Sequence, residues 1–305
     1  MSEAPAGVRV AAHAKLNLFL RILSRESSGY HQIETAFALL ELADELIVRR
    51  TESGVTLDVE GEGEGGGPNL GPSDENLAVR AARMVLDATG NRFGVAIKLT
   101  KRIPVRAGLG GGSSNGAAAL HAVNALAANA VPRHELLHFA AKLGADVAFF
   151  ASGAALALAW GRGERQFRMP APPSLPALVA VPQVQVATPE AYAWWDAQNR
   201  SPSPRGPVTL DADALSTWGS IGRLGGNDFE AVVFGKHPEL RTLYERVAET
   251  GPVWVRLCGS GSAVAAVYKK ERERDDAVQR LGTKNQRLIA TATRATAAPA
   301  PATLP

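Results

Sequence analysis

The chain has 305 residues, of which 46% are apolar and 21% are charged, and its formal net charge is +3. This composition excludes a wholly disordered chain, a collagen-like repeat and a coiled coil, and so small a charge excess is no signature of a nucleic-acid-binding protein. Because Cys258 is the single cysteine, an intrachain disulfide and a zinc site built on thiolates are excluded as well.

Short strands and helices alternate in the first half of the chain. Short apolar or alternating runs predict strands at residues 8–12, 16–23, 33–40, 45–50, 55–59, 95–100 and 154–159. Apolar residues three and four positions apart predict helices at residues 76–88, 113–128 and 134–143. Ser73 or Asp74 is the expected N-cap of the first helix, because a short polar side chain there can accept a bond from a free backbone N–H.

A proline-rich segment at residues 169–176 predicts a domain boundary. Beyond it, the same patterns predict strands at 177–181, 253–258, 263–268 and 288–293, and helices at 189–196, 227–234, 238–249 and 270–280. We therefore expect two α+β domains with mixed or antiparallel sheets, over residues 1–168 and 169–294. Residues 295–305 are rich in Ala, Pro and Thr and predict a disordered tail.

Glycine is concentrated in three clusters that call for different interpretations. The first, residues 61–67, matches the dinucleotide-binding pattern G-x-G-x-x-G after a strand. No helix follows it, however, and the three glutamates within and before it would repel a pyrophosphate. This cluster therefore predicts a flexible hairpin loop.

The second cluster, residues 108–112, is followed by Ser113 and Ser114 at the predicted start of a helix. Glycines let the backbone approach a ligand closely, and a helix N-terminus offers free N–H groups to an anion, so this segment predicts a phosphate-binding loop. A mobile hinge with Ser113 as a helix cap is the alternative, although a hinge needs only one or two glycines. The third cluster, residues 259–262, is by itself a tight turn and gains meaning only if it faces the second across a cleft. Three basic residues precede the second cluster: Lys101, Arg102 and Arg106.

Residues 108–114 resemble the phosphate loop of the GHMP kinases, a superfamily that includes galactose, homoserine, mevalonate and phosphomevalonate kinases. The resemblance implies the two-domain α+β GHMP kinase fold, with a glycine-rich phosphate loop opening a helix. Further segments resemble the branch of this superfamily that acts on 4-diphosphocytidyl-2-C-methyl-D-erythritol. These segments are residues 14–20, 28–35, 143–150, 227–230 and 258–264.

This resemblance implies that Asp146 accepts the proton of the substrate's C2 hydroxyl and that Lys15 lies beside it. An ammonium there would keep the carboxylate ionised and stabilise negative charge on the attacking oxygen. The residues themselves support a pairing, since both lie in apolar stretches and charged side chains are seldom buried alone. A purely structural ion pair is the alternative.

The resemblance also implies how two ligands would be held. Tyr30, His31 and Tyr192 would contact the cytosine, and Asn17 and Thr188 would donate or accept further hydrogen bonds; a capped turn is the alternative for Tyr30 and His31. ATP would bring Mg²⁺, whose protein ligands stay open, with Ser114 a candidate. The ATP site would comprise Asn76, Lys101, Gly108, Leu109, Gly110, Gly111, Gly112, Ser113 and Ser114.

The expected activity is thus ATP-dependent phosphorylation of the C2 hydroxyl of 4-diphosphocytidyl-2-C-methyl-D-erythritol, in the non-mevalonate route to isoprenoid precursors. Two alternatives stay open: another GHMP kinase of the homoserine or mevalonate type, or a catalytically inactive homologue that acts as a binding protein. We expect a cytoplasmic protein, since no signal peptide and no apolar run of about 20 residues is present. For its oligomeric state we expect a monomer or weak homodimer. Neither nucleic acid nor membrane is an expected partner, and no structural metal is expected from the histidine spacing.

Overall fold

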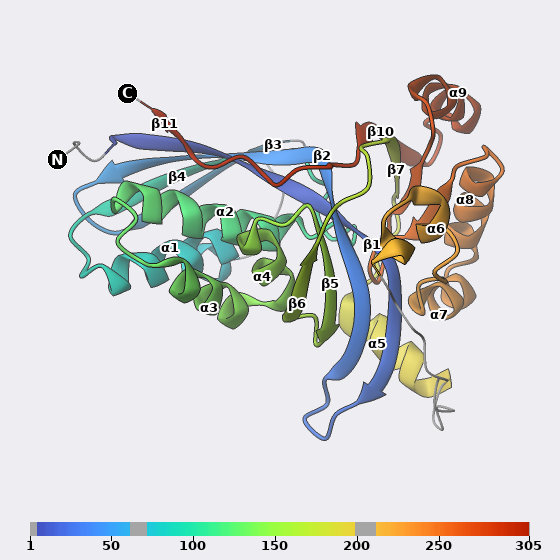
Figure 1. Cartoon of the computed structure of the whole chain (residues 1–305), viewed down its shortest axis with the longest axis horizontal. Helices are drawn as coiled ribbons and strands as arrows, with labels where there is room; N and C mark the ends of the chain where they lie inside the picture. The colour runs from blue at the N-terminus through green and yellow to red at the C-terminus, as the bar shows by residue number, and fades with distance from the viewer. Residues whose placement is uncertain (1–4, 62–71, 199–211, 305) are drawn as a thin grey trace.

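The structure is a computed structural model that describes residues 5–61, 72–198 and 212–304. Two long antiparallel strands, β1 (Gly7–Arg25) and β2 (His31–Thr51), run from the N-terminal end of the molecule to a hairpin beside α5 (Thr188–Gln198) (Figure 1). Each was expected as two shorter strands. Shifts in register between His13 and Lys15 and between Asn17 and Leu20 absorb the irregular stretches, so that pairing continues through them.

These strands belong to a seven-stranded sheet in which β11, β1, β2, β4 and β3 follow one another. β4 (Gly94–Lys101) pairs with one end of β2, and β5 (Leu156–Gly161), followed by β6 (Arg165–Met169), pairs with the other end. β3 (Val55–Gly61) is parallel to β4, whereas the other pairs in this sheet are antiparallel. The mixed sheet of the expected α+β class is therefore confirmed.

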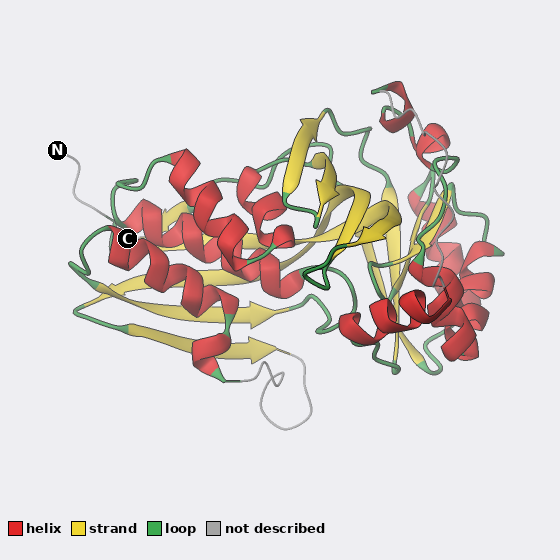
Figure 2. Cartoon of the chain, turned by 90° about the horizontal axis from the view of Figure 1, so that it is seen from below, coloured by secondary structure: helices red, strands yellow, loops and turns green. Residues whose placement is uncertain are grey.

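Four helices pack together on this sheet (Figure 2). Their apolar sides and the sheet share one core cluster, which includes Val10, Leu46, Val85 and Leu120. Burial of such side chains is the main stabilising contribution, at roughly 25 cal/mol per Å² of apolar surface. The helices are α1 (Leu77–Ala88), α2 (Gly111–Leu126), α3 (Arg133–Leu143) and α4 (Ala145–Ser152).

The second half forms a four-stranded antiparallel sheet in the order β10-β7-β9-β8. A core cluster shared with β1 and β2 joins this sheet to the first, and Trp254 Nε1 donates to the Leu18 carbonyl at 2.9 Å. The strands are β7 (Pro176–Pro182), β8 (Trp254–Leu257), β9 (Val264–Val267) and β10 (Gln286–Ala292). The remaining helices are α6 (Trp218–Ile221), α7 (Phe229–Lys236), α8 (Pro238–Ala248) and α9 (Glu271–Leu281).

The prediction of a disordered tail over residues 295–305 was wrong for residues 302–304. Residues Ala302–Leu304 form β11, which pairs antiparallel with residues 7–9 of β1 (Figure 1). The physical reason is that β1 would otherwise be an edge strand here, and its unpaired backbone groups accept a short extended partner irrespective of side-chain composition. The tail is further held by Arg294, whose guanidinium donates to the Glu41 carboxylate at 2.5 Å.

Other boundaries differ from the prediction for local reasons. Asn76, and not Ser73 or Asp74, caps α1, because its side chain accepts from the Ala78 N–H at 2.9 Å. α2 begins at Gly111 and not at Ser113. Neither α4 nor β6 was predicted. The proline-rich residues 201–207 and the first glycine cluster, apart from Gly61 at the end of β3, lie outside the described residues.

Candidate active site

The second glycine cluster forms the N-terminus of α2. Gly108 and Gly110 take φ angles of 79° and 72°, which favour glycine, and Gly110 is the N-cap residue. The helical ladder starts with the Ser114 N–H, which donates to the Gly110 carbonyl at 2.9 Å. The N–H groups of Gly111, Gly112 and Ser113 therefore have no partner within the helix, and they open onto a cavity of about 340 Å³. Such an end binds anions.

Ser114 is not brought to this cavity, which corrects its assignment as a phosphate or metal contact. Its side chain is buried and lines a separate cavity with Val10, His13, Ala117 and residues 298–301. The reason is the earlier start of α2: with the first turn at Gly111, the helical period turns residue 114 away from the loop and toward β1. Ser113, one position earlier, does line the loop cavity.

Lys101 and Asn76 both line the loop cavity. The Lys101 ammonium, however, is held by the carboxylate of Asp44, and Asn115 Oδ1 lies 3.2 Å from it. Asp44 is fully buried and also accepts from the backbone N–H groups of Arg102 and Ile103 at 2.7 and 2.8 Å. The Asp44 carboxylate thus compensates the charge of Lys101, and the pair supports the phosphate loop. Asp44 was not identified from the sequence.

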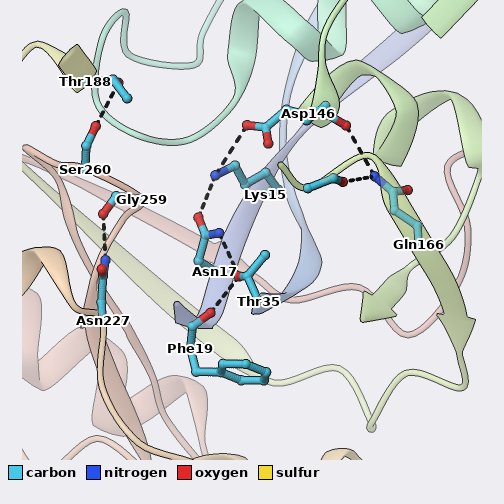
Figure 3. A network of polar contacts seen from close by, with 12 residues as sticks. Lys15, Asn17, Phe19, Thr35, Asp146, Gln166, Thr188, Asn227, Gly259 and Ser260 are labelled. Carbon is cyan, nitrogen blue, oxygen red and sulfur yellow. Dashed lines mark hydrogen bonds and ion pairs between the residues drawn. The ribbon is translucent and has the colours of Figure 1, made fainter. Parts of the chain in front are cut away.

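The third glycine cluster lies directly against the second. A Cβ atom on Gly108 would stand 1.8 Å from the carbonyl oxygen of Cys258, so the two loops touch through their backbones. Arg106 and Gly108 share a cavity of about 510 Å³ with Ser260, Gly261 and residues 185–190. The third cluster therefore faces the second, which is the condition under which it gains meaning. Asn227 holds the third cluster by donating to the Gly259 carbonyl at 2.6 Å (Figure 3).

Cys258 is fully buried at this contact, and burial raises the pKa of its thiol to about 12. Because the thiolate is the reactive form, we expect the folded protein to resist alkylation by iodoacetamide at pH 8, with the thiol becoming reactive once the chain is unfolded in guanidinium chloride. Intact-mass measurement before and after unfolding checks this. Rapid labelling of the native protein would contradict the described packing.

Lys15 and Asp146 meet at the mouth of the loop. Lys15 Nζ lies 3.5 Å from Asp146 Oδ2 (Figure 3). The Lys15 backbone N–H donates to the Leu109 carbonyl at 3.0 Å, which ties β1 to the phosphate loop. The side chain of Lys15 is 5% exposed and that of Asp146 is 35% exposed. The Asp146 carboxylate is therefore accessible to a ligand, whereas the Lys15 ammonium is buried behind it.

Asp146 owes its position to the first turn of α4. The amide of Gln166 on β6 donates to the carbonyls of Ala145 and Gly163 at 3.2 and 2.9 Å, which joins the start of α4 to the β5–β6 hairpin (Figure 3). An acidic group in the first helical turn is also favoured by the helix dipole. The unpredicted helix thus explains how a carboxylate within an apolar stretch reaches the site.

An aromatic group lies on α5 and β2. The rings of His31 and Tyr192 are stacked with centroids 4.3 Å apart, and His31 Nε2 lies 2.7 Å from Asp196 Oδ1. Burial, and secondarily the charge of Asp146, raise the pKa of Tyr192 to about 12, so the phenol is neutral in the physiological range. Tyr30 is 60% exposed and lies under the Arg162 guanidinium, which is 4.1 Å from its ring centroid. Asp196 was missed by sequence reasoning.

Two further predicted residues join these parts. Asn17 is buried and accepts from Lys15 Nζ at 2.6 Å. The hydroxyl of Thr188 at the start of α5 lies 2.9 Å from that of Ser260 (Figure 3). The phosphate loop, the Lys15–Asp146 pair and the stacked rings therefore come from distant parts of the sequence. Within the described ranges, no group of three or more His, Cys, Asp or Glu residues could hold a metal ion, and no helix is long and apolar enough to cross a membrane.

Both halves of the chain match known protein families. Residues 76–159 match the family of GHMP kinases N-terminal domains, and residues 211–287 match that of GHMP kinases C-terminal domains. The solved homoserine kinase of Cytophaga hutchinsonii is 18% identical with a TM-score of 0.73 over 100% of this chain and 99% of that one, a likeness of fold. Fold and site together define a GHMP kinase.

Closer relatives narrow the family. A 4-diphosphocytidyl-2-C-methyl-D-erythritol kinase of Solibacter usitatus is 37% identical over 89% of this chain and 84% of its own, and one of Chlorobaculum tepidum is 38% identical over 85% and 88%. A crystal structure of 4-(cytidine 5'-diphospho)-2C-methyl-D-erythritol kinase has 35% identity and a TM-score of 0.77, covering 93% of this chain and 98% of that one. The chain belongs to the 4-diphosphocytidyl-2-C-methyl-D-erythritol kinase family.

Proposed function

We propose that this protein transfers the γ-phosphate of ATP to the C2 hydroxyl of 4-diphosphocytidyl-2-C-methyl-D-erythritol, giving the 2-phosphate and ADP. The observation that carries the proposal is the contact of Lys15 and Asp146 beside the phosphate loop, together with a stacked aromatic pair on β2 and α5. The reaction belongs to the non-mevalonate route to isoprenoid precursors. We place it in the cytoplasm, in a monomer or weak homodimer without nucleic-acid or membrane partners.

In this reaction the hydroxyl oxygen attacks the γ-phosphorus as the bond to the leaving ADP oxygen breaks. Asp146 accepts the hydroxyl proton, and the Lys15 ammonium stabilises the negative charge that develops on the attacking oxygen. The contact of 3.5 Å between them supports this division of roles, because both groups can reach one hydroxyl. In-line positioning of the hydroxyl and the γ-phosphate supplies the rest of the rate acceleration, as is usual in phosphoryl transfer.

ATP is held by the start of α2. Its phosphates receive hydrogen bonds from the N–H groups of Gly111, Gly112 and Ser113, and Gly108, Leu109 and Gly110 shape the cradle. Asn76 lines the same cavity and contacts the nucleotide, whereas Lys101 keeps the loop in place through Asp44.

Mg²⁺ accompanies the nucleotide. The residues fit this ion, which prefers oxygen ligands and keeps several waters, because the Ser113 hydroxyl offers an oxygen ligand beside the loop while the phosphates supply others. When bound, the ion neutralises charge on the phosphates.

The cytosine is read by the aromatic group on β2 and α5. Aromatic faces stack on bases at about 1–3 kcal/mol each, which suits Tyr30 and Tyr192. His31 uses Nε2 for Asp196, which leaves Nδ1 for a hydrogen bond at the base edge. Asn17 and Thr188 complete the polar contacts. The Asp196 carboxylate supports His31 by fixing its ring.

We expect His31→Ala to raise KM for the cytidylyl substrate about 5- to 150-fold, by analogy with the cost of about 1–3 kcal/mol for losing one such contact, and to leave KM for ATP nearly unchanged. Initial rates with each substrate varied in turn check this. His138→Ala, at an exposed position on α3, is the control. An unchanged KM for the cytidylyl substrate would contradict the assignment of His31.

The proposed function is tested by ADP release with 4-diphosphocytidyl-2-C-methyl-D-erythritol, homoserine and mevalonate offered separately. Turnover with the first and not with the others is the expected result. Turnover with homoserine or mevalonate alone would favour another GHMP kinase. ATP binding without turnover of any of the three would favour an inactive homologue.

A further inference from the structure

A chain of buried polar groups lies behind Lys15. Lys15 Nζ donates to Asn17 Oδ1 at 2.6 Å, and Asn17 Nδ2 donates to Thr35 Oγ1 at 2.9 Å. The Thr35 hydroxyl in turn donates to the backbone carbonyl of Phe19 at 2.6 Å (Figure 3). Lys15 is 4%, Asn17 is 2% and Thr35 is 0% exposed, so solvent does not compete for these bonds.

The direction of every bond in this chain is fixed by its two ends. An ammonium can only donate and a carbonyl can only accept. Because the single hydroxyl proton of Thr35 is committed to the Phe19 carbonyl, its oxygen can only accept from Asn17. The Asn17 NH₂ group must therefore face Thr35, and the Asn17 oxygen must face the ammonium of Lys15.

An irregularity in β1 makes the chain possible. The register between β1 and β2 shifts between Asn17 and Leu20, and within this irregular stretch the Phe19 carbonyl accepts from the Thr35 side chain. Such bulges re-aim groups next to functional sites. Thr35 is thus bound to the irregular part of the strand that presents Lys15.

We propose that Thr35 is a positioning residue, which orients the Asn17 amide so that its oxygen holds the Lys15 ammonium beside Asp146. Thr35 touches neither ligand, and it acts through Asn17. Without the Thr35 hydroxyl, the buried NH₂ group of Asn17 loses its acceptor, and the amide is then held in place by the Lys15 ammonium alone. The inference rests on the proposed function, because its effect is measured on phosphoryl transfer.

The test is Thr35→Val, which keeps the shape of the side chain and removes the hydroxyl. We expect kcat to fall about tenfold, as for the loss of one buried hydrogen bond to a charged network, while KM for ATP stays within about twofold. Thr35→Ser, which keeps the hydroxyl, should restore most of kcat. An unchanged kcat in Thr35→Val would overturn the proposal.

A double-mutant cycle separates positioning from a general loss of stability. In an Asn17→Ala background, Thr35→Val should lower kcat by no more than about twofold further, since the two residues act in series. If the two substitutions instead lowered kcat independently, so that the loss in the double variant equalled the product of the two single losses, the proposal would be overturned. Thr293→Val is the matched control: this threonine is as buried and accepts from the Leu175 N–H at 2.9 Å, so its loss should lower the melting temperature and leave kcat unchanged.

A measurement on the wild-type protein covers the case in which Thr35→Val does not fold. Nuclear Overhauser contacts from the Asn17 side-chain NH₂ protons to the Thr35 side chain are expected, and their absence would overturn the proposal. This result does not depend on turnover. A wild-type protein with these contacts and no kinase activity would refute the proposed function and leave the orientation of Asn17 intact.

Discussion

Replacing Asp146 by Asn should lower kcat for phosphorylation of the cytidylyl substrate about 100- to 10,000-fold, the usual contribution of a general base, while ATP still binds. The amide has nearly the shape of the carboxylate but cannot accept the hydroxyl proton, and it withdraws the negative partner from Lys15 at 3.5 Å. Steady-state kinetics with a fluorescent nucleotide titration measure both quantities.

Two controls make this result specific. Gln166→Ala removes the amide that holds the start of α4 but leaves the Asp146 carboxylate, so its loss in kcat should be much smaller. Thermal unfolding of Asp146→Asn should be close to that of the wild type, because this side chain is partly exposed. Near-normal turnover by Asp146→Asn would rule out its role as the base and favour a structural ion pair.

Gly108→Ala should be the most damaging substitution in the phosphate loop. A methyl group there would stand 1.8 Å from the Cys258 carbonyl oxygen, on a residue whose φ of 79° is already unfavourable for other residues. Left-handed strain and overpacking together cost about 2–5 kcal/mol in the free energy of unfolding. Because the third glycine loop must then move away, ATP binding should weaken as well.

Gly112→Ala is the matched control within the same loop. Nothing lies within 4 Å of a Cβ atom at Gly112, and alanine is the better helix former by up to about 1 kcal/mol. Its melting temperature should equal or exceed that of the wild type. Equal melting temperatures for Gly108→Ala and Gly112→Ala would show that the two loops do not touch as described.

The sequence predicted most of the regular elements because their apolar periodicity is a local property. Residues 77–88 and 238–248 show this clearly, since a helical face of apolar residues is visible before any partner is known. Helix α4 escaped prediction because it is apolar on nearly every side, with Val147, Ala148 and Phe149 all buried. Such a segment has no polar face to reveal its period.

Among the candidate site residues, those in dense local motifs were easiest to find. The glycine loop could be recognised from its residue types alone. Ser114 was assigned to the wrong side of the helix because α2 begins at Gly111, two residues before the predicted start. A shift of two residues rotates a helical position by more than half a turn. Asp44, Asp196 and Thr35 had no such signal. Each is an ordinary residue whose importance lies in a partner 57, 165 or 18 positions away along the chain.

The sequence by itself thus determined the class of the fold, the phosphate loop and the residues with which this chain resembles its relatives. Only the tertiary structure decided which groups share a hydrogen bond: Lys101 with Asp44 under the loop, His31 with Asp196, Thr35 with Asn17, and the tail with the edge of β1. The physical reason is that periodicity and backbone preference act over a few residues. A buried polar group, by contrast, must be satisfied by whatever the topology brings next to it.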